Sequence, residues 1–100
     1  ESAGAGSVSA HLLTPRSWPY FQRAAMESGP VSQWTAQTMA DASAHFEQLA
    51  AACNCSFGGA VACLEAASWQ DLVAAQGHVA PPTDGSNQWS PVSDGVELAE

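Results

Sequence analysis

The chain opens with Glu1-Ser2-Ala3-Gly4, which matches the pattern Gly-x-Ser-x-Gly except for the glycine that would precede Glu1. In that pattern a serine occupies a strained turn from a strand into a helix, and the residues two before and two after it are small because their backbones crowd one another. Gly4 is the small residue required two positions after the serine, and the position two before the serine would precede Glu1. The turn would expose the Ser2 hydroxyl and aim the backbone N–H of Ala3 toward a developing oxyanion.

A helix that Pro15 ends is expected directly after this turn. The first ten residues are almost all small, and Leu12 and Leu13 then make the segment apolar before Thr14-Pro15. Small side chains would let this helix pack closely on a neighbouring sheet. A Ser-x-Gly near the start of a chain is also explained by a serine that caps a helix. The hypothesis that Ser2 is a nucleophile therefore depends on the rest of the sequence.

Composition indicates a folded segment and excludes several kinds of partner. Of the 100 residues, 46% are hydrophobic and only 12% are charged, which is typical of a chain that forms a core. Ten acidic residues face two basic ones, and the net charge of −8 disfavours binding to nucleic acids or anionic membrane surfaces. The sequence contains no apolar run near the roughly 20 residues that a membrane helix needs, and leaves membrane association otherwise open. Because the chain starts at Glu1 and stops abruptly, residues 1–100 are expected to be part of one domain, incomplete at both ends.

The remaining elements are expected to be mostly helical. Apolar residues at three-to-four spacing predict a helix over residues 41–52, whose start could lie nearer Ser32 or Thr35. Two more helices are expected at residues 59–67 and 68–76, the second with Ser68 as N-cap, Asp71 completing a capping box and Gly77 as its stop. The other expectations are a short buried strand within residues 20–28, a loop over residues 81–87 and an extended segment over residues 89–96 that enters a turn.

Further motifs follow the Ser2 pattern in a defined order. They are His11-Leu12-Leu13-Thr14-Pro15, Phe21-Gln22-Arg23-Ala24-Ala25-Met26-Glu27-Ser28-Gly29, Trp34, Cys53, Cys63-Leu64 and Pro91-Val92-Ser93-Asp94-Gly95. With these motifs the chain resembles the type-B carboxylesterase and cholinesterase family. That family reads Gly-Glu-Ser-Ala-Gly, then a helix ending His-x-Leu-(Ser/Thr)-Pro, then Phe-x-Arg-Ala before a Ser-Gly pair, and later Pro-Val-x-Asp-Gly. The resemblance covers essentially the whole chain.

The resemblance implies an α/β-hydrolase, a mostly parallel central sheet flanked by helices, of which this chain would be a mostly helical part with one or two short strands. It implies a serine carboxylic-ester hydrolase that needs no cofactor, forms a covalent acyl-enzyme on Ser2 and acts on small-molecule esters. Such enzymes place the acid and then the histidine after the serine. His11 lies roughly 13 Å from Ser2 along a helix, at about 1.5 Å per residue, and cannot be its base. His45 and His78 are interpreted as packing or surface residues.

The catalytic histidine, the acid and the glycine-rich part of the oxyanion hole are therefore expected outside these residues, and residues 1–100 alone are expected to be inactive. By the same resemblance, Glu1 would be a carboxylate that shapes the electrostatics beside the nucleophile, with Ser28 as its hydrogen-bond partner. Trp34 would help to form the acyl pocket. Large aromatics from the loop before Pro91 narrow that pocket in cholinesterases, whereas Gly85 and Asn87 would leave more space and favour a general carboxylesterase.

The three cysteines allow a disulfide more readily than a metal site. Cys-x-Cys plus one further cysteine falls short of the four ligands of a structural zinc site, so no metal is expected. The resemblance favours a disulfide between Cys53 and Cys63, although the sequence also allows Cys55 to pair with Cys63. A disulfide would place the protein in an oxidising compartment, secreted or facing outward.

The sequence also allows two other functions. A non-catalytic adhesion or binding relative of the same fold is one, but such relatives often lack the serine that stands here at Ser2. A small independent acidic helical module, with Ser2 as a mere cap, is the other. It would have to form a core without strands that pair.

Overall fold

The computed structural model describes residues 1–29, 36–55, 58–82 and 86–98. The chain forms two compact units, Glu1–Met39 with Pro82–Glu100 and Ala40–Pro81. Each unit has a core of mainly small side chains, Ala5 and Ser9 in the first and Ala50 and Ala75 in the second. The expectations for Trp34 and Gly85 lie outside the described residues.

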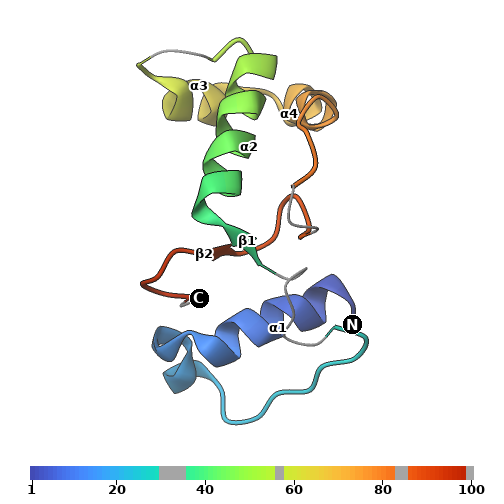
Figure 1. The fold of residues 1–100 in the computed structure, drawn as a ribbon, viewed down its shortest axis with the longest axis vertical. Helices are drawn as coiled ribbons and strands as arrows, with labels where there is room; N and C mark the ends of the chain where they lie inside the picture. Colours follow the sequence, from blue (N-terminus) through green and yellow to red (C-terminus); the bar gives the residue numbers. More distant parts are fainter. Residues whose placement is uncertain (30–35, 56–57, 83–85, 99–100) are drawn as a thin grey trace. The chain divides into compact units, whose positions relative to one another are not determined.

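Helix α1 spans Ala3–Leu13 and confirms the helix expected before Pro15 (Figure 1). Thr14 Oγ1 donates to the Ala10 carbonyl at 2.8 Å, and the 3₁₀ helix η1, Pro15–Tyr20, follows directly. The Trp18 indole N–H donates back to the Leu12 carbonyl at 3.0 Å. The chain thus turns sharply at Pro15, which has no N–H to continue the α-helical ladder.

The strand expected within residues 20–28 is wrong for the described structure. Phe21 has extended backbone, with φ −152° and ψ 158°, but residues 21–29 belong to no strand. A strand is defined by a ladder of hydrogen bonds to a neighbour. In the described part of the chain this segment makes one such backbone bond, from the Ser2 N–H to the Glu27 carbonyl at 3.0 Å. The segment therefore lies against the start of α1 without forming a sheet there.

Two short strands, β1 (Gln37–Thr38) and β2 (Val92–Ser93), pair in parallel (Figure 1). Strand β2 confirms an extended segment within residues 89–96, although Trp89 lies in a turn. The idea that the next helix could begin near Ser32 or Thr35 is wrong, because Gln37 and Thr38 are extended. Gln37 donates its backbone N–H to the Pro91 carbonyl at 2.8 Å, which fixes the register of this pair.

The turn after β2 is organised by the Asp94 carboxylate. Its Oδ1 accepts the backbone N–H groups of Val96 and Glu97 at 2.9 Å and of Leu98 at 3.1 Å. Gly95 has φ 73°, a left-handed conformation that suits glycine. These backbone hydrogen bonds, led by those of Val96 and Leu98, lower the pKa of Asp94 from its ordinary value of 3.8.

We expect the stability supplied by this turn to depend on pH. Because the pKa of Asp94 is lower in the folded chain, its contribution is present above pH 3.8 and is lost as pH falls through the lowered pKa. Wild type should therefore be more stable than Asp94→Asn at neutral pH, and the difference should shrink in acid. Denaturant unfolding at a series of pH values measures it. A difference that stays constant down to about pH 2.5 would contradict the assignment.

The second unit contains three helices. Helix α2 spans Met39–Ala52, α3 spans Ala60–Ala66 and α4 spans Trp69–Gln76. These bounds confirm the helices expected within residues 41–52, 59–67 and 68–76. The capping box is also confirmed, because the Asp71 N–H donates to Ser68 Oγ at 3.1 Å and that hydroxyl donates to Asp71 Oδ2 at 2.6 Å. The Ala80 N–H donates to the Gln48 side chain at 2.7 Å, which ties the chain after α4 back to α2.

The disulfide joins Cys55 to Cys63, and the pairing of Cys53 with Cys63 is wrong. The reason lies in how α2 ends. Asn54 adopts a left-handed φ of 56°, the Asn54 N–H donates to the Ala51 carbonyl, and the Cys55 N–H donates to the Ala50 carbonyl at 2.7 Å. These two bonds form a Schellman motif, whose last residue packs against the helix. Cys55 occupies that position, only 4% exposed, and is thereby placed to bridge to α3.

This pairing predicts unequal effects of two cysteine substitutions on stability. Cys63→Ser opens the bridge and should lower the free energy of unfolding by about 2–3 kcal/mol, as for other short disulfide loops. Cys53→Ser removes only the free thiol and should leave stability nearly unchanged. Thermal unfolding of both variants without reductant tests this. An equal loss in both would mean that Cys53 takes part in the native bridge.

Candidate active site

The backbone of Ser2 has the strained geometry that the opening motif predicts. Its φ is 48° and its ψ is −117°, a combination that residues other than glycine rarely adopt. Such a conformation costs about 1–3 kcal/mol and persists only where the surrounding structure fixes it. An ordinary N-cap residue has β-region backbone and accepts a hydrogen bond on its side chain. Ser2 has neither feature, because its backbone lies outside the β region and its side chain makes no capping hydrogen bond. The interpretation of Ser2 as a simple cap is therefore wrong.

Ala3 is the first residue of α1, so its N–H has no acceptor within the helix. It lies at the positive end of the helix dipole, next to the exposed Ser2. This is the position expected of an oxyanion donor. The next turn closes through the Gly4 N–H to the Glu1 carbonyl at 2.9 Å and the Gly6 N–H to the Ser2 carbonyl at 3.0 Å.

Among the described glycines, the one that packs most tightly against this turn is Gly29, the glycine of the Ser28-Gly29 pair quoted above. A Cβ at Gly29 would lie 2.5 Å from the Ser2 carbonyl oxygen and 2.6 Å from the Ala5 Cβ. Real Cβ atoms essentially never approach other atoms so closely. By contrast, a Cβ at Gly4 would meet nothing within 4 Å in the described structure. The crowding expected at Gly4 is thus found, among the described residues, at Gly29.

Two hydrogen bonds hold the segment before Gly29 against α1. The Ser2 N–H donates to the Glu27 carbonyl, as noted above, and the Ser9 hydroxyl contacts the Met26 sulfur at 3.2 Å. Ser9 is 1% exposed and also donates to the Ala5 carbonyl. Ser28, between these contacts and Gly29, has a left-handed φ of 55°. The strained Ser2 is therefore held by a second strained turn that packs against it.

A cavity of about 500 Å³ opens beside the turn. Ser2 and Ala3 line one side of it, and the segment Asn87–Pro91 lines the other. One lining residue is aromatic, the half-exposed Trp89. Ser2 and Ala3 thus line a space large enough for a small ligand.

The buried side chain of Gln37 supports the far wall of the cavity. Its Nε2 donates to the Ser90 carbonyl at 2.9 Å, and its backbone pairs with Pro91 as part of the β1–β2 ladder. Gln37 is 5% exposed. Sequence analysis missed this residue, and no local pattern marks it, because its partners lie more than 50 positions away in the chain.

Several predicted site residues are present without the predicted contacts. Glu1 and Ser28 are both exposed, and within the described residues no hydrogen bond joins them. Their roles beside the nucleophile stay predictions. Trp34 lies outside the described residues, so its place at the acyl pocket is also still a prediction.

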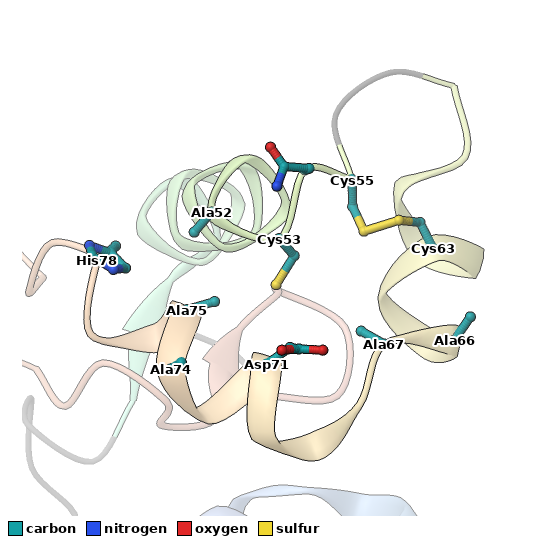
Figure 2. A pocket seen from close by; sticks show the side chains of 11 residues that line it. Ala52, Cys53, Cys55, Cys63, Ala66, Ala67, Asp71, Ala74, Ala75 and His78 are labelled. Atoms are coloured by element: carbon teal, nitrogen blue, oxygen red, sulfur yellow. A yellow bond between two sulfur atoms is a disulfide. The ribbon is translucent and has the colours of Figure 1, made fainter.

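The three histidines have different surroundings, and only His11 lies in the same unit as Ser2. His11 lies far along α1 and contacts the Ser17 hydroxyl at 2.9 Å. His45 is buried in α2 of the other unit, as a packing residue would be. His78 is exposed and lines a separate cavity in that unit (Figure 2). That the base for Ser2 lies outside these residues stays a prediction.

Within the described ranges, no group of three or more His, Cys, Asp or Glu side chains is placed to hold a metal ion. The same ranges include no helix that is both long and apolar enough to cross a lipid bilayer.

The sequence is similar to known esterases. The sequence model of the carboxylesterase family matches residues 1–100. Acetylcholinesterase of Gallus gallus is 36% identical over 86 residues, which are 82% of this chain and 11% of that protein. Acetylcholinesterase of Danio rerio is 34% identical over 108 residues, covering 96% of this chain and 16% of the relative. Cholinesterase 2 of Branchiostoma lanceolatum is 51% identical over 57 residues, covering 56% of this chain and 17% of the relative. The chain thus spans less than a fifth of the length of these relatives.

Proposed function

Because the chain belongs to the carboxylesterase family of α/β-hydrolases, we propose that it carries the nucleophile of a serine ester hydrolase. The observation that supports this most directly is the backbone of Ser2, strained at φ 48° beside a cavity and without a capping bond. Residues with strained backbones cluster at functional sites. In serine hydrolases such a strained turn exposes the nucleophilic hydroxyl at the start of a helix.

In the proposed reaction, Ser2 Oγ attacks the ester carbonyl carbon while a histidine from elsewhere in the complete protein takes its proton. The carbonyl oxygen becomes an oxyanion, which the N–H of Ala3 stabilises together with donors outside these residues. The tetrahedral adduct then expels the alcohol and leaves an acyl group on Ser2. Water releases the acid by the reverse sequence of steps. Residues 1–100 alone should not turn over substrate, because they supply no base for Ser2.

The acyl group would occupy the cavity between the Ser2 turn and the segment Asn87–Pro91. This segment presents Asn87 and one aromatic residue, Trp89, to the cavity. The small polar side chain of Asn87 supports a pocket that accepts acyl groups larger than acetyl. We therefore propose a general carboxylesterase and not an enzyme restricted to acetylcholine, although relatives in the comparison are named acetylcholinesterases.

A substitution at Asn87 tests the size of this pocket. Asn87→Phe would fill part of the cavity, so we expect kcat/KM for 4-nitrophenyl butyrate to fall relative to 4-nitrophenyl acetate by about tenfold. Gln70→Phe, which adds the same ring to an exposed position of α4, is the matched control and should leave the ratio unchanged. An unchanged ratio in Asn87→Phe would mean that the acyl group binds elsewhere.

Hydrolysis of an ester panel by the complete protein tests the proposed function itself. We expect turnover of 4-nitrophenyl acetate and butyrate, with acetylthiocholine not preferred over both. A strong preference for acetylthiocholine would contradict the general carboxylesterase. No hydrolysis of any ester would contradict the enzyme and favour a binding relative of the same fold.

We also propose that the protein is secreted or faces the exterior of the cell. The Cys55–Cys63 disulfide supports this location, because such bridges form and persist in oxidising compartments.

A further inference from the structure

Gln37 holds the cavity wall Asn87–Pro91 with two hydrogen bonds to consecutive carbonyl groups. Its backbone N–H donates to the Pro91 carbonyl at 2.8 Å, and its side-chain Nε2 donates to the Ser90 carbonyl at 2.9 Å. Gln37 is not one of the described residues that line the cavity. Any influence of Gln37 on a bound ligand therefore passes through the wall that it holds.

The two hydrogen bonds depend on Gln37 in different ways. The backbone bond belongs to the parallel pair of β1 and β2, in which Gln37 lies opposite Val92, and every residue except proline has the N–H to make it. The bond to Ser90 lies before the start of β2 and requires a side-chain donor with the reach of glutamine. Because Gln37 is only 5% exposed, water has little access to replace that donor.

Ser90 connects this anchor to the residues that line the cavity. Its backbone N–H donates to the Asn87 carbonyl at 3.1 Å and closes a turn over residues 87–90, all of which line the cavity. The Ser90 hydroxyl is buried and has no hydrogen-bond partner in the described structure. It is thus the main chain of Ser90, and not its side chain, that ties the turn to β1. Without the Gln37 side chain, the turn would keep its own closing bond but lose this anchor.

We infer that Gln37 is a positioning residue that sets the acyl-chain selectivity of the ester hydrolysis, an inference that rests on the proposed function. An acetyl group on Ser2 ends one carbon beyond its carbonyl, whereas a butyryl group extends two carbons further into the cavity. The longer chain therefore depends more on the position of the wall. Loosening the wall should slow hydrolysis of the longer ester and spare the shorter one.

Gln37→Met in the complete protein tests this inference. The substitution removes the side-chain donor, keeps a side chain of similar length and leaves the backbone bond to Pro91 in place. We expect kcat/KM for 4-nitrophenyl butyrate to fall about fivefold, the factor that one typical hydrogen bond contributes, with kcat/KM for 4-nitrophenyl acetate unchanged. The loss should appear mainly in KM, because the wall would contact the acyl chain in both the bound ester and the transition state.

Two further variants make the result specific. Gln37→Asn keeps an amide but shortens the side chain, so it should lower the ratio of butyrate to acetate kcat/KM in the same way. Gln48→Met is the matched control, because the Gln48 side chain accepts the Ala80 N–H at 2.7 Å within the other unit. It also removes one hydrogen bond between a glutamine side chain and the backbone, and it should keep the wild-type ratio. Near-ultraviolet circular dichroism verifies that each variant is folded.

The outcomes separate this inference from the function on which it rests. A wild-type ratio in folded Gln37→Met and Gln37→Asn would overturn the inference and leave the esterase standing. An equal loss with both esters would also overturn it, because the change would then have displaced Ser2 and not the wall. If wild type hydrolysed neither ester, the proposed function would fail and the inference with it.

Discussion

Replacing Ser2 with alanine in the complete protein should abolish ester hydrolysis. Ser2 lies in the strained turn and lines the cavity, and its side chain makes no capping hydrogen bond to α1. Loss of the nucleophile costs other serine hydrolases about a million-fold in kcat, because an acyl-enzyme can no longer form. We expect a loss of similar size here, with little change in thermal stability, since in the described structure the substitution removes no hydrogen bond that caps α1.

The control for this variant is Ser43→Ala, an equal change at an exposed position of α2 in the other unit. It should keep wild-type kcat for 4-nitrophenyl butyrate. A Ser2→Ala protein that retained more than about a hundredth of wild-type kcat would show that another residue is the nucleophile.

The second large effect is expected at Gly29. A methyl group there would lie 2.5 Å from the Ser2 carbonyl oxygen and 2.6 Å from the Ala5 Cβ, and neither atom belongs to a flexible side chain. The backbone of the Ser2 turn would therefore have to move. Because a displacement of about 1 Å at a reacting group can cost about 10²-fold in rate, Gly29→Ala should lower kcat/KM by about a hundredfold. Overpacking should also cost about 1–3 kcal/mol of stability.

Gly59→Ala provides the comparison, because a Cβ at Gly59 meets nothing within 4 Å among the described residues. It adds the same methyl group and should leave kcat/KM near wild type. Temperature-dependent circular dichroism separates lost folding from a displaced nucleophile, since the rate should fall even at temperatures where Gly29→Ala is fully folded. Wild-type activity in folded Gly29→Ala would mean that the contact between Gly29 and the Ser2 turn does not position the nucleophile.

Local signals in the sequence predicted most of the helical structure. Pro15 ends α1 because it lacks a donor, and Ser68 with Asp71 begins α4 because their side chains satisfy backbone groups within one turn. Both rules depend only on residues that are neighbours in the chain. The helix bounds could for this reason be predicted within about two residues.

Features that depend on distant partners or on one backbone angle were missed. The segment 20–28 has strand-like residues, but a strand also requires a neighbour, and the described structure provides only the Ser2–Glu27 bond. The disulfide pairing depended on the left-handed φ of Asn54. An asparagine just after an apolar helix is a signal for such a turn, and it could have indicated Cys55 in place of Cys53.

The candidate site also combines features that neighbouring residues predict with features that depend on distant partners. The motif around Ser2 predicted the strained turn and the place of Ala3 at the start of α1, because the pattern consists of consecutive residues. The packing of Gly29 and the support from Gln37 come from residues 27 and 35 positions away from Ser2, and only the folded chain brings them together.

Covalent labelling tests the central claim most directly. The complete protein is treated with a fluorophosphonate, digested and mapped by tandem mass spectrometry. The account predicts one phosphonylated residue, Ser2, formed in step with the loss of ester hydrolysis and absent from Ser2→Ala. Stoichiometric label on a different serine, or full loss of activity with Ser2 unmodified, would contradict it.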